Sequence, residues 1–153
     1  MHIAQLNIGR LAYDLDDQRV EGFLAGREVL DRIVARSSGF VWKHSASFGE
    51  RRAEVVMGDP RVLVSYSIWE SAAALKNFVW NTLHKRFYLR KAEWFKPMTE
   101  AHLVLWWVDE GERPSLDEAM GRLNRLREYG PTQEAFDWAY LDRAHASVEL
   151  EGS

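Results

Sequence analysis

Apolar residues recur at helical spacing between residues 71 and 95, which is the longest helix that the sequence predicts. Its buried stripe advances by three or four residues at a time and comprises Leu75, Phe78, Val79, Leu83 and Phe87. A second row, spaced one turn apart, comprises Trp80, His84 and Tyr88, whose side chains therefore share one edge of the helix. We expect this edge to line a pocket, because it carries aromatic rings and an imidazole.

Short apolar or alternating runs predict four strands, over residues 2–11, 40–44, 61–69 and 101–108. In the first, Ala4, Leu6 and Ile8 share one face. Asn7 shares the other face, together with further polar residues. That polar face must therefore border either solvent or a wet cavity.

The second and fourth strands are rich in aromatic residues. The alternation predicts that Phe40, Trp42 and His44 lie on one face of the second strand. The fourth strand has apolar residues on both faces, as an interior strand does.

Two more helices are predicted, over residues 14–36 and 115–130. The second of these begins at a capping residue, Ser115, and ends at Gly130. Residues 132–141 fit either a short helix or a terminal strand. Residues 45–60 are expected to form a loop that could act as a mobile lid.

The succession β-α-β-β-α-β is that of the ferredoxin-like unit, here with an extra C-terminal helix, so the predicted fold class is α+β. Such a unit has helices on one face of its sheet only, and the face that holds Asn7 then needs a cover. A second copy of the chain is the simplest cover, so we expect a homodimer, a dimeric α+β barrel with aromatic-lined cavities. The 153 residues fit a single domain over residues 1–143 and a flexible tail at 144–153.

Composition narrows the classes of partner. Seven tryptophans raise the aromatic share to 12%, and such residues often line ligand cavities. A net charge of −3 gives no basic surface for nucleic acid or an anionic membrane. The absence of cysteine excludes disulfides and thiolate nucleophiles. No signal peptide or membrane-spanning apolar run is present, so we expect a cytoplasmic protein.

His84 is the strongest candidate for chemistry, because an imidazole can serve as acid, base or axial ligand near neutral pH. The alternative is a histidine that only bonds a neighbour at a cavity rim. Asn7 could orient a substrate carbonyl or be satisfied by backbone groups. Arg90 could reach a substrate carboxylate but also fits a solvated helix face. Residues that could wall a cavity or fill the core are Trp42, His44, Trp69, Trp80, Tyr88 and Trp106.

Other kinds of site lack their motifs. The five histidines are scattered without an HxH or HExxH pair, which argues against zinc, while a two-histidine, one-carboxylate iron site assembled through space stays open. No nucleophile elbow, phosphate loop or dinucleotide fingerprint is present. Hydrolase, kinase and NAD-dependent activities therefore have no support.

Five phrases carry a family resemblance: GFVW at 39–42, SIWES at 67–71, FVWNTLH at 78–84, LVLWWV at 103–108 and GP-x-x-EAF at 130–136. Together they resemble a bacterial family known as domain of unknown function 3291. That family is similar to the antibiotic-biosynthesis-monooxygenase group of the dimeric α+β barrel superfamily, whose members range from oxygenases to plain binding proteins. In haem-degrading relatives, an Asn on the first strand and a Trp and a His on the second helix shape the pocket. Asn7, Trp80 and His84 occupy similar positions.

The resemblance implies a monooxygenase-like tailoring enzyme of secondary metabolism, acting on a hydrophobic aromatic or polycyclic substrate. Without a cofactor, His84 would deprotonate the substrate for reaction with dioxygen, while Asn7 and a Trp indole such as that of Trp80 would stabilise the oxyanion. A second interpretation makes His84 the axial ligand of a haem. A third is a non-catalytic, small-molecule-binding dimer.

Overall fold

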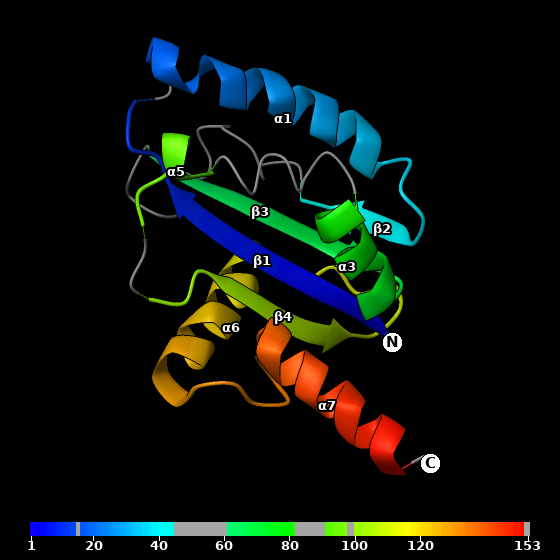
Figure 1. Cartoon of the computed structure of the whole chain (residues 1–153). Coiled ribbons are helices and arrows are strands. Elements are labelled where there is room, and N and C mark those ends of the chain that lie inside the picture. Colours follow the sequence, from blue (N-terminus) through cyan, green and yellow to red (C-terminus); the bar gives the residue numbers. More distant parts are fainter. Residues whose placement is uncertain (15, 45–60, 82–90, 98–99, 152–153) are drawn as a thin grey trace.

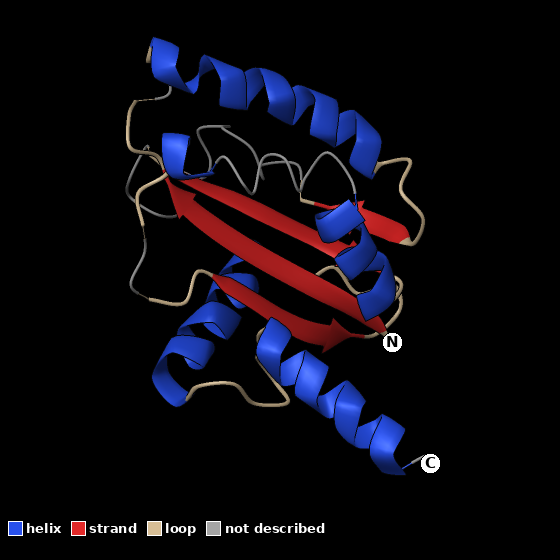
Figure 2. Cartoon of the chain, in the orientation of Figure 1, coloured by secondary structure: helices blue, strands red, loops and turns tan. Residues whose placement is uncertain are grey.

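The structure is a computed structural model that describes residues 1–14, 16–44, 61–81, 91–97 and 100–151. Strands β1 (His2–Arg10), β2 (Phe40–Lys43), β3 (Val62–Trp69) and β4 (Leu103–Val108) form an antiparallel sheet in the order β2-β3-β1-β4 (Figures 1 and 2). The helical segments are η1 (Gln18–Val20), α1 (Glu21–Val34), α3 (Ala72–Asn81), α5 (Lys91–Trp94), α6 (Leu116–Tyr129) and α7 (Trp138–Glu151). The predicted α+β class is confirmed. None of these helices, within the described ranges, is long and apolar enough to cross a membrane.

One face of the sheet is apolar and packs against α6; we call it the α6 face. Strand β1 contributes Ala4, Leu6 and Ile8, as the alternation predicts. The buried residues that α6 places against this face are Ala119, Leu123 and Leu126. The helix forms where predicted, because the Ser115 hydroxyl accepts a hydrogen bond from the Glu118 amide and Gly130 adopts a positive φ of 75° at the other end.

The opposite face, which we call the α3 face, is covered at its two ends by separate apolar clusters. At one end, Ile3 and Trp69 pack with Leu75 and Phe78 of α3. The cluster at the other end comprises Leu11, Val20, Phe23, Leu63 and Trp94, so it includes residues of η1, α1 and α5. Polar side chains occupy the middle of this face.

The expectation of helices on one face only is wrong. Figure 1 shows α3 in front of the sheet and α6 behind it, and their side chains belong to clusters on opposite faces. The physical reason is that α6 follows β4 after a short turn and buries its apolar stripe on the face that Ala4, Leu6 and Ile8 offer. Each face thus has a cover from the chain's own helices. The homodimer stays a prediction. The sequence predicts it because one face of the sheet would lack a cover, whereas the structure shows helices on both faces.

The predicted alternation of β2 is also wrong, because the strand contains a bulge. Phe40 is opposite Trp69, whereas Trp42 is opposite Ile68, so one extra residue lies between the two pairs. An extra residue reverses which face the following side chains take. Phe40 therefore packs on Trp69 across the α3 face, while Trp42 and His44 lie on the α6 face.

Strand β4 is buried on both faces, but it ends the sheet rather than lying inside it. The outer edge of β4 is bridged by Phe136, whose backbone exchanges hydrogen bonds of 2.8 and 2.9 Å with Leu105. The sequence allows residues 132–141 to be either a short helix or a terminal strand, and the structure contains some of each. Isolated β-bridges form at Thr132–Ala135 and at Phe136, and α7 begins just after them. The α7 helix runs to Glu151, into the segment for which the sequence predicts a flexible tail.

The predicted long helix is described at its two ends. Its first part, α3, begins where the Ser71 hydroxyl accepts a hydrogen bond from the Ala74 amide at 3.1 Å, as expected of a cap. Leu75 and Phe78 are buried and Val79 is partly buried, which confirms this part of the stripe. The remaining members, Leu83 and Phe87, and the predicted loop at 45–60 lie outside the described residues.

Two glycines allow a matched test of packing on β1. A Cβ at Gly9 would lie 2.8 Å from two ring carbons of Phe95, whereas a Cβ at Gly121 in α6 would meet nothing within 4 Å. We expect Gly9→Ala to lower the free energy of unfolding by about 1–3 kcal/mol through overpacking. Gly121→Ala should raise the free energy of unfolding by about 0.5–1 kcal/mol, because glycine is unfavourable inside a helix. Urea unfolding measures both, and equal midpoints for the two variants would contradict the predicted contact with Phe95.

Candidate functional site

Four polar side chains lie in the middle of the α3 face, and we call them the polar strip: Gln5 and Asn7 of β1, and Ser65 and Ser67 of β3. Gln5 is opposite Ser67, and Asn7 is opposite Ser65. Gln5 and Ser67 are buried, with only 8% and 7% of their surface exposed, while Asn7 and Ser65 are half-buried. Polar groups buried in a sheet need hydrogen-bond partners.

The Gln5 amide supplies most of these hydrogen bonds. Its Nε2 donates to Ser67 Oγ at 2.8 Å, to Ser65 Oγ at 3.2 Å and to the Ser65 carbonyl at 3.4 Å. The carbonyl can only accept, so the amino side of the amide must face β3. Trp69 Nε1 also donates to Ser67 Oγ, at 3.0 Å. The hydroxyl oxygen of Ser67 therefore accepts from two nitrogen donors.

Asn7 differs from its neighbours on the strip. Among the residues that the structure describes, no side chain or backbone group forms a hydrogen bond with its amide. The sequence predicts that Asn7 faces solvent or a wet cavity, and its half-buried position on the α3 face agrees with that prediction. Both a donor and an acceptor of Asn7 remain for another molecule.

Aromatic and apolar side chains border the strip. Trp69 packs on Phe78 with ring centroids 5.0 Å apart, at one end. At the other end the Phe95 ring lies against Gly9. Leu103 and Trp107, on the neighbouring strand β4, are partly buried. A polar floor with aromatic and aliphatic borders is the composition typical of a small-molecule site.

A second aromatic group lies on the α6 face. Tyr66 contacts Trp42 edge-on at 5.2 Å, stacks with His44 at 6.0 Å and lies 5.8 Å from Trp106. The Tyr66 hydroxyl donates to the Pro114 carbonyl at 2.7 Å, and burial raises the pKa of this hydroxyl, so it stays protonated. Trp106 is fully buried in the cluster that packs against α6. This group is part of the core.

The candidate residues predicted from the sequence are thus divided between two faces. Asn7 and Trp69 lie on the α3 face, whereas Trp42, His44 and Trp106 lie on the α6 face. The sequence allows these residues either to wall a cavity or to fill the core. Trp42, His44 and Trp106 pack on the α6 face, because the bulge in β2 and the alternation of β4 place them there.

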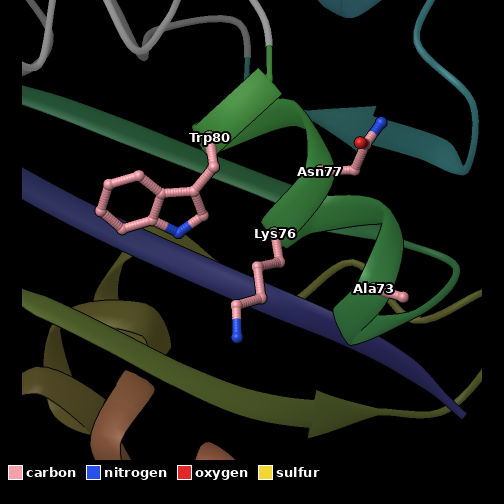
Figure 3. Close-up of a pocket in the computed structure, with 4 residues that line it drawn as sticks. All are labelled: Ala73, Lys76, Asn77 and Trp80. Carbon is pink, nitrogen blue, oxygen red and sulfur yellow. The ribbon is translucent and has the colours of Figure 1, made fainter.

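Trp80 lies on α3. It is 40% exposed and lines an open hollow of about 410 Å³ together with Ala73, Lys76 and Asn77. Figure 3 shows Trp80 and Lys76 extending to one side of the helix, with Asn77 on the other. Lys76 also pairs with Asp142 of α7 at 2.9 Å, which ties the two helices together.

A family model described as Domain of unknown function (DUF3291) matches residues 2–150. The chain belongs to this family. Searches among curated proteins and among solved structures each gave no match. The comparisons provide no link to the antibiotic-biosynthesis-monooxygenase group, so that part of the resemblance remains a prediction.

Three predicted site residues of this DUF3291 protein, His84, Tyr88 and Arg90, lie outside the described residues. On the described strands, His2 and His44 are placed with the α6 face, so neither supplies an imidazole to the strip. Within the described ranges, no group of three or more His, Cys, Asp or Glu side chains could hold a metal ion. No histidine of the described strands would therefore face a haem on the α3 face.

Sequence reasoning missed Gln5, Ser65 and Ser67. The available signal was the pair of serines two residues apart in the otherwise apolar run VLVSYSIW, directed to the same face as the polar residues of β1. In a strand, residues two apart share a face. Two serines therefore mark a polar patch rather than scattered small residues.

Replacing Ser67 in the DUF3291 protein should cost more stability than replacing Ser65. Ser67→Ala leaves the Trp69 indole and one Gln5 proton without their acceptor, so we expect the free energy of unfolding to fall by about 1–3 kcal/mol. Ser65→Ala leaves Gln5 bonded to Ser67, and its cost should stay below about 1 kcal/mol. Urea unfolding followed by tryptophan fluorescence compares them. Equal losses would show that Ser67 is not the centre of the network.

Proposed function

We propose that this DUF3291 protein binds a small, largely apolar molecule against the polar strip of the α3 face. The observation that carries this proposal is the half-buried Asn7 amide, which lies between aromatic borders without a hydrogen-bond partner among the described residues. Binding sites for small molecules are mostly apolar and contain a few polar groups that orient the ligand. The strip has that composition.

An energetic comparison favours a binding role over a purely structural one. Burying polar groups in a sheet gives little net stability even when they are hydrogen-bonded, whereas apolar side chains at the same positions would contribute about 1.5–3 kcal/mol each. The α6 face of the same strands uses apolar residues throughout its core. The strip on the α3 face is thus a stability cost that a ligand would explain.

The reaction we propose is that of a monooxygenase-like tailoring enzyme, and its support is the family resemblance. The polar strip would contribute donors to a developing oxyanion, with Asn7 among them. The base would be His84, as the sequence predicts. The described residues give no reason to favour haem as the cofactor over a cofactor-free reaction.

The ferredoxin-like class is also proposed here, supported by the strand order. Strand β3 lies between β1 and β2, which is the arrangement of a split β-α-β unit. A homodimer is compatible with this class, although α6 occupies the face that a second sheet would otherwise cover.

Binding can be tested with 2-acetylnaphthalene, which combines an aromatic body with one carbonyl group. We expect isothermal titration to detect binding to the wild type and an approximately tenfold weaker affinity for Asn7→Leu, because one hydrogen bond is lost. Asn124→Leu makes the same chemical change at an exposed position of α6 and should bind like the wild type. No binding to the wild type, or equal affinity for Asn7→Leu, would contradict the site.

Oxygenation is tested separately with 1,4-dihydroxynaphthalene under air in an oxygen electrode. Oxygen uptake above the spontaneous rate, abolished in His84→Ala and reduced in Asn7→Leu, is the expected result. If 1,4-dihydroxynaphthalene binds but oxygen uptake does not exceed the spontaneous rate, the oxygenation of this substrate is excluded. The result would then support the non-catalytic, small-molecule-binding interpretation.

A further inference from the structure

The Ser67 hydroxyl is fixed as a hydrogen-bond donor. Its oxygen accepts from Gln5 Nε2 at 2.8 Å and from Trp69 Nε1 at 3.0 Å. A hydroxyl has two lone pairs and one proton, so both acceptor positions are used and only the proton remains. Neither neighbour can take that proton, because an indole N–H and an amide NH₂ only donate.

No acceptor for this proton lies within the described part of the chain. Ser67 is more than nine-tenths buried and forms no hydrogen bond there as a donor. Leaving a buried hydroxyl proton unpaired is unfavourable. The two donors that bond to the oxygen also polarise the O–H bond, since successive hydrogen bonds strengthen one another. The Ser67 proton is therefore a strengthened donor without an acceptor among the residues that the structure describes.

A further donor and a cation lie near the same position. Asn7 is the diagonal neighbour of Ser67 across β1 and β3, close enough for both side chains to reach one oxygen atom. Lys43 of β2 is directly opposite Ser67 in the register, on the side of the sheet that Ser67 shares. The strip itself contains no carboxylate. A ligand oxygen that accepts hydrogen bonds, with or without a negative charge, suits this arrangement better than an ammonium group, because the positive charge of Lys43 would repel an ammonium.

We infer that the ligand presents an accepting oxygen, either a carbonyl or an oxyanion conjugated to an apolar body, to the Ser67 hydroxyl and the Asn7 amide. This inference rests on the proposed binding at the strip and deepens it. The ligand class comprises aryl ketones, quinones, phenolates and aryl carboxylates. Gln5 and Trp69 act as positioning residues, because their two N–H groups occupy the acceptor positions of the Ser67 oxygen and so direct its proton away from the Gln5 amide and the indole.

The test uses four compounds with the same aromatic body: 2-acetylnaphthalene, 2-naphthoate, 2-naphthylmethylammonium and naphthalene. Titration calorimetry at neutral pH should give affinities for the ketone and the carboxylate that are at least about tenfold higher than for the other two. This selectivity is measured on the wild-type protein and needs no variant. Equal affinity for naphthalene or the ammonium compound would overturn the inference while leaving the proposed binding intact.

Variants then assign the donor. Ser67→Ala should weaken the affinity for 2-acetylnaphthalene about tenfold and leave the affinity for naphthalene unchanged. Ser38→Ala, the same chemical change at an exposed position in the turn before β2, is the control and should change neither affinity by more than about twofold. Ser67→Cys, which keeps a small side chain with a weak donor, should fall between wild type and Ser67→Ala. Equal weakening of both compounds by Ser67→Ala would mean a structural role only, and would overturn the assignment.

A vibrational readout separates a hydrogen bond from a change in packing. The carbonyl stretch of bound 2-acetylnaphthalene should shift to lower wavenumber in the wild type, relative to an apolar solvent. In Ser67→Ala the stretch should move part of the way back to its value in the apolar solvent, because Asn7 still donates. An unshifted stretch in the wild type would overturn the inference. If none of the four compounds binds, the proposed function fails, and the inference fails with it.

Discussion

The structure depends on the alternation of β1, which is hydrogen-bonded on both sides. It pairs with β3 from Ile3 to Arg10 and with β4 from His2 to Asn7. A slip of one residue would exchange the faces of the strand. Three buried apolar side chains would then leave α6, at a cost of about 1.5–3 kcal/mol each, and two amides would enter an apolar core. This cost fixes the register of the whole sheet.

The position of the polar strip follows from the same constraint. Since one face of β1 must be apolar to receive α6, its polar side chains can gather only on the α3 face. There, the apolar clusters occupy the two ends of the sheet and leave the middle to Gln5, Asn7 and their partners on β3. Gln5 is tolerated because serine oxygens take its protons. Within the described residues, the network therefore has its hydrogen bonds on the β3 side, while the Asn7 amide and the Ser67 proton have no partner.

Much of the fold could be predicted because its signals are local. The faces of β1, the Ser115 cap, the Gly130 stop and the buried stripe of α3 all depend on residues within a few positions of each other. Local patterns do not predict which face of the sheet α6 covers, because the apolar stripe of a helix can pack against either face. The pairing of Phe136 with β4 was likewise hidden, because two backbone hydrogen bonds leave no trace in side-chain periodicity.

The candidate site was predictable in part. Asn7 and Trp69 were selected from the sequence because large aromatics and a polar residue in an apolar strand are conspicuous. The serines were missed because a single small residue carries little information, and only the pairing with β1 shows that they share a face with Gln5. Hydrogen-bond direction, which gives Ser67 its character as a donor, depends on distances between side chains of two strands.

The bulge in β2 determines which chemistry lies beside the strip. If the alternation had continued from Phe40 opposite Trp69, Trp42 would be opposite Ser67 and His44 opposite Ser65, so an imidazole would border the site. The extra residue instead places Lys43 opposite Ser67 and sends His44 to the α6 face, where it stacks on Tyr66. One inserted residue thus exchanges a potential base for a cation. The described part of the α3 face consequently favours holding a ligand oxygen over removing a ligand proton.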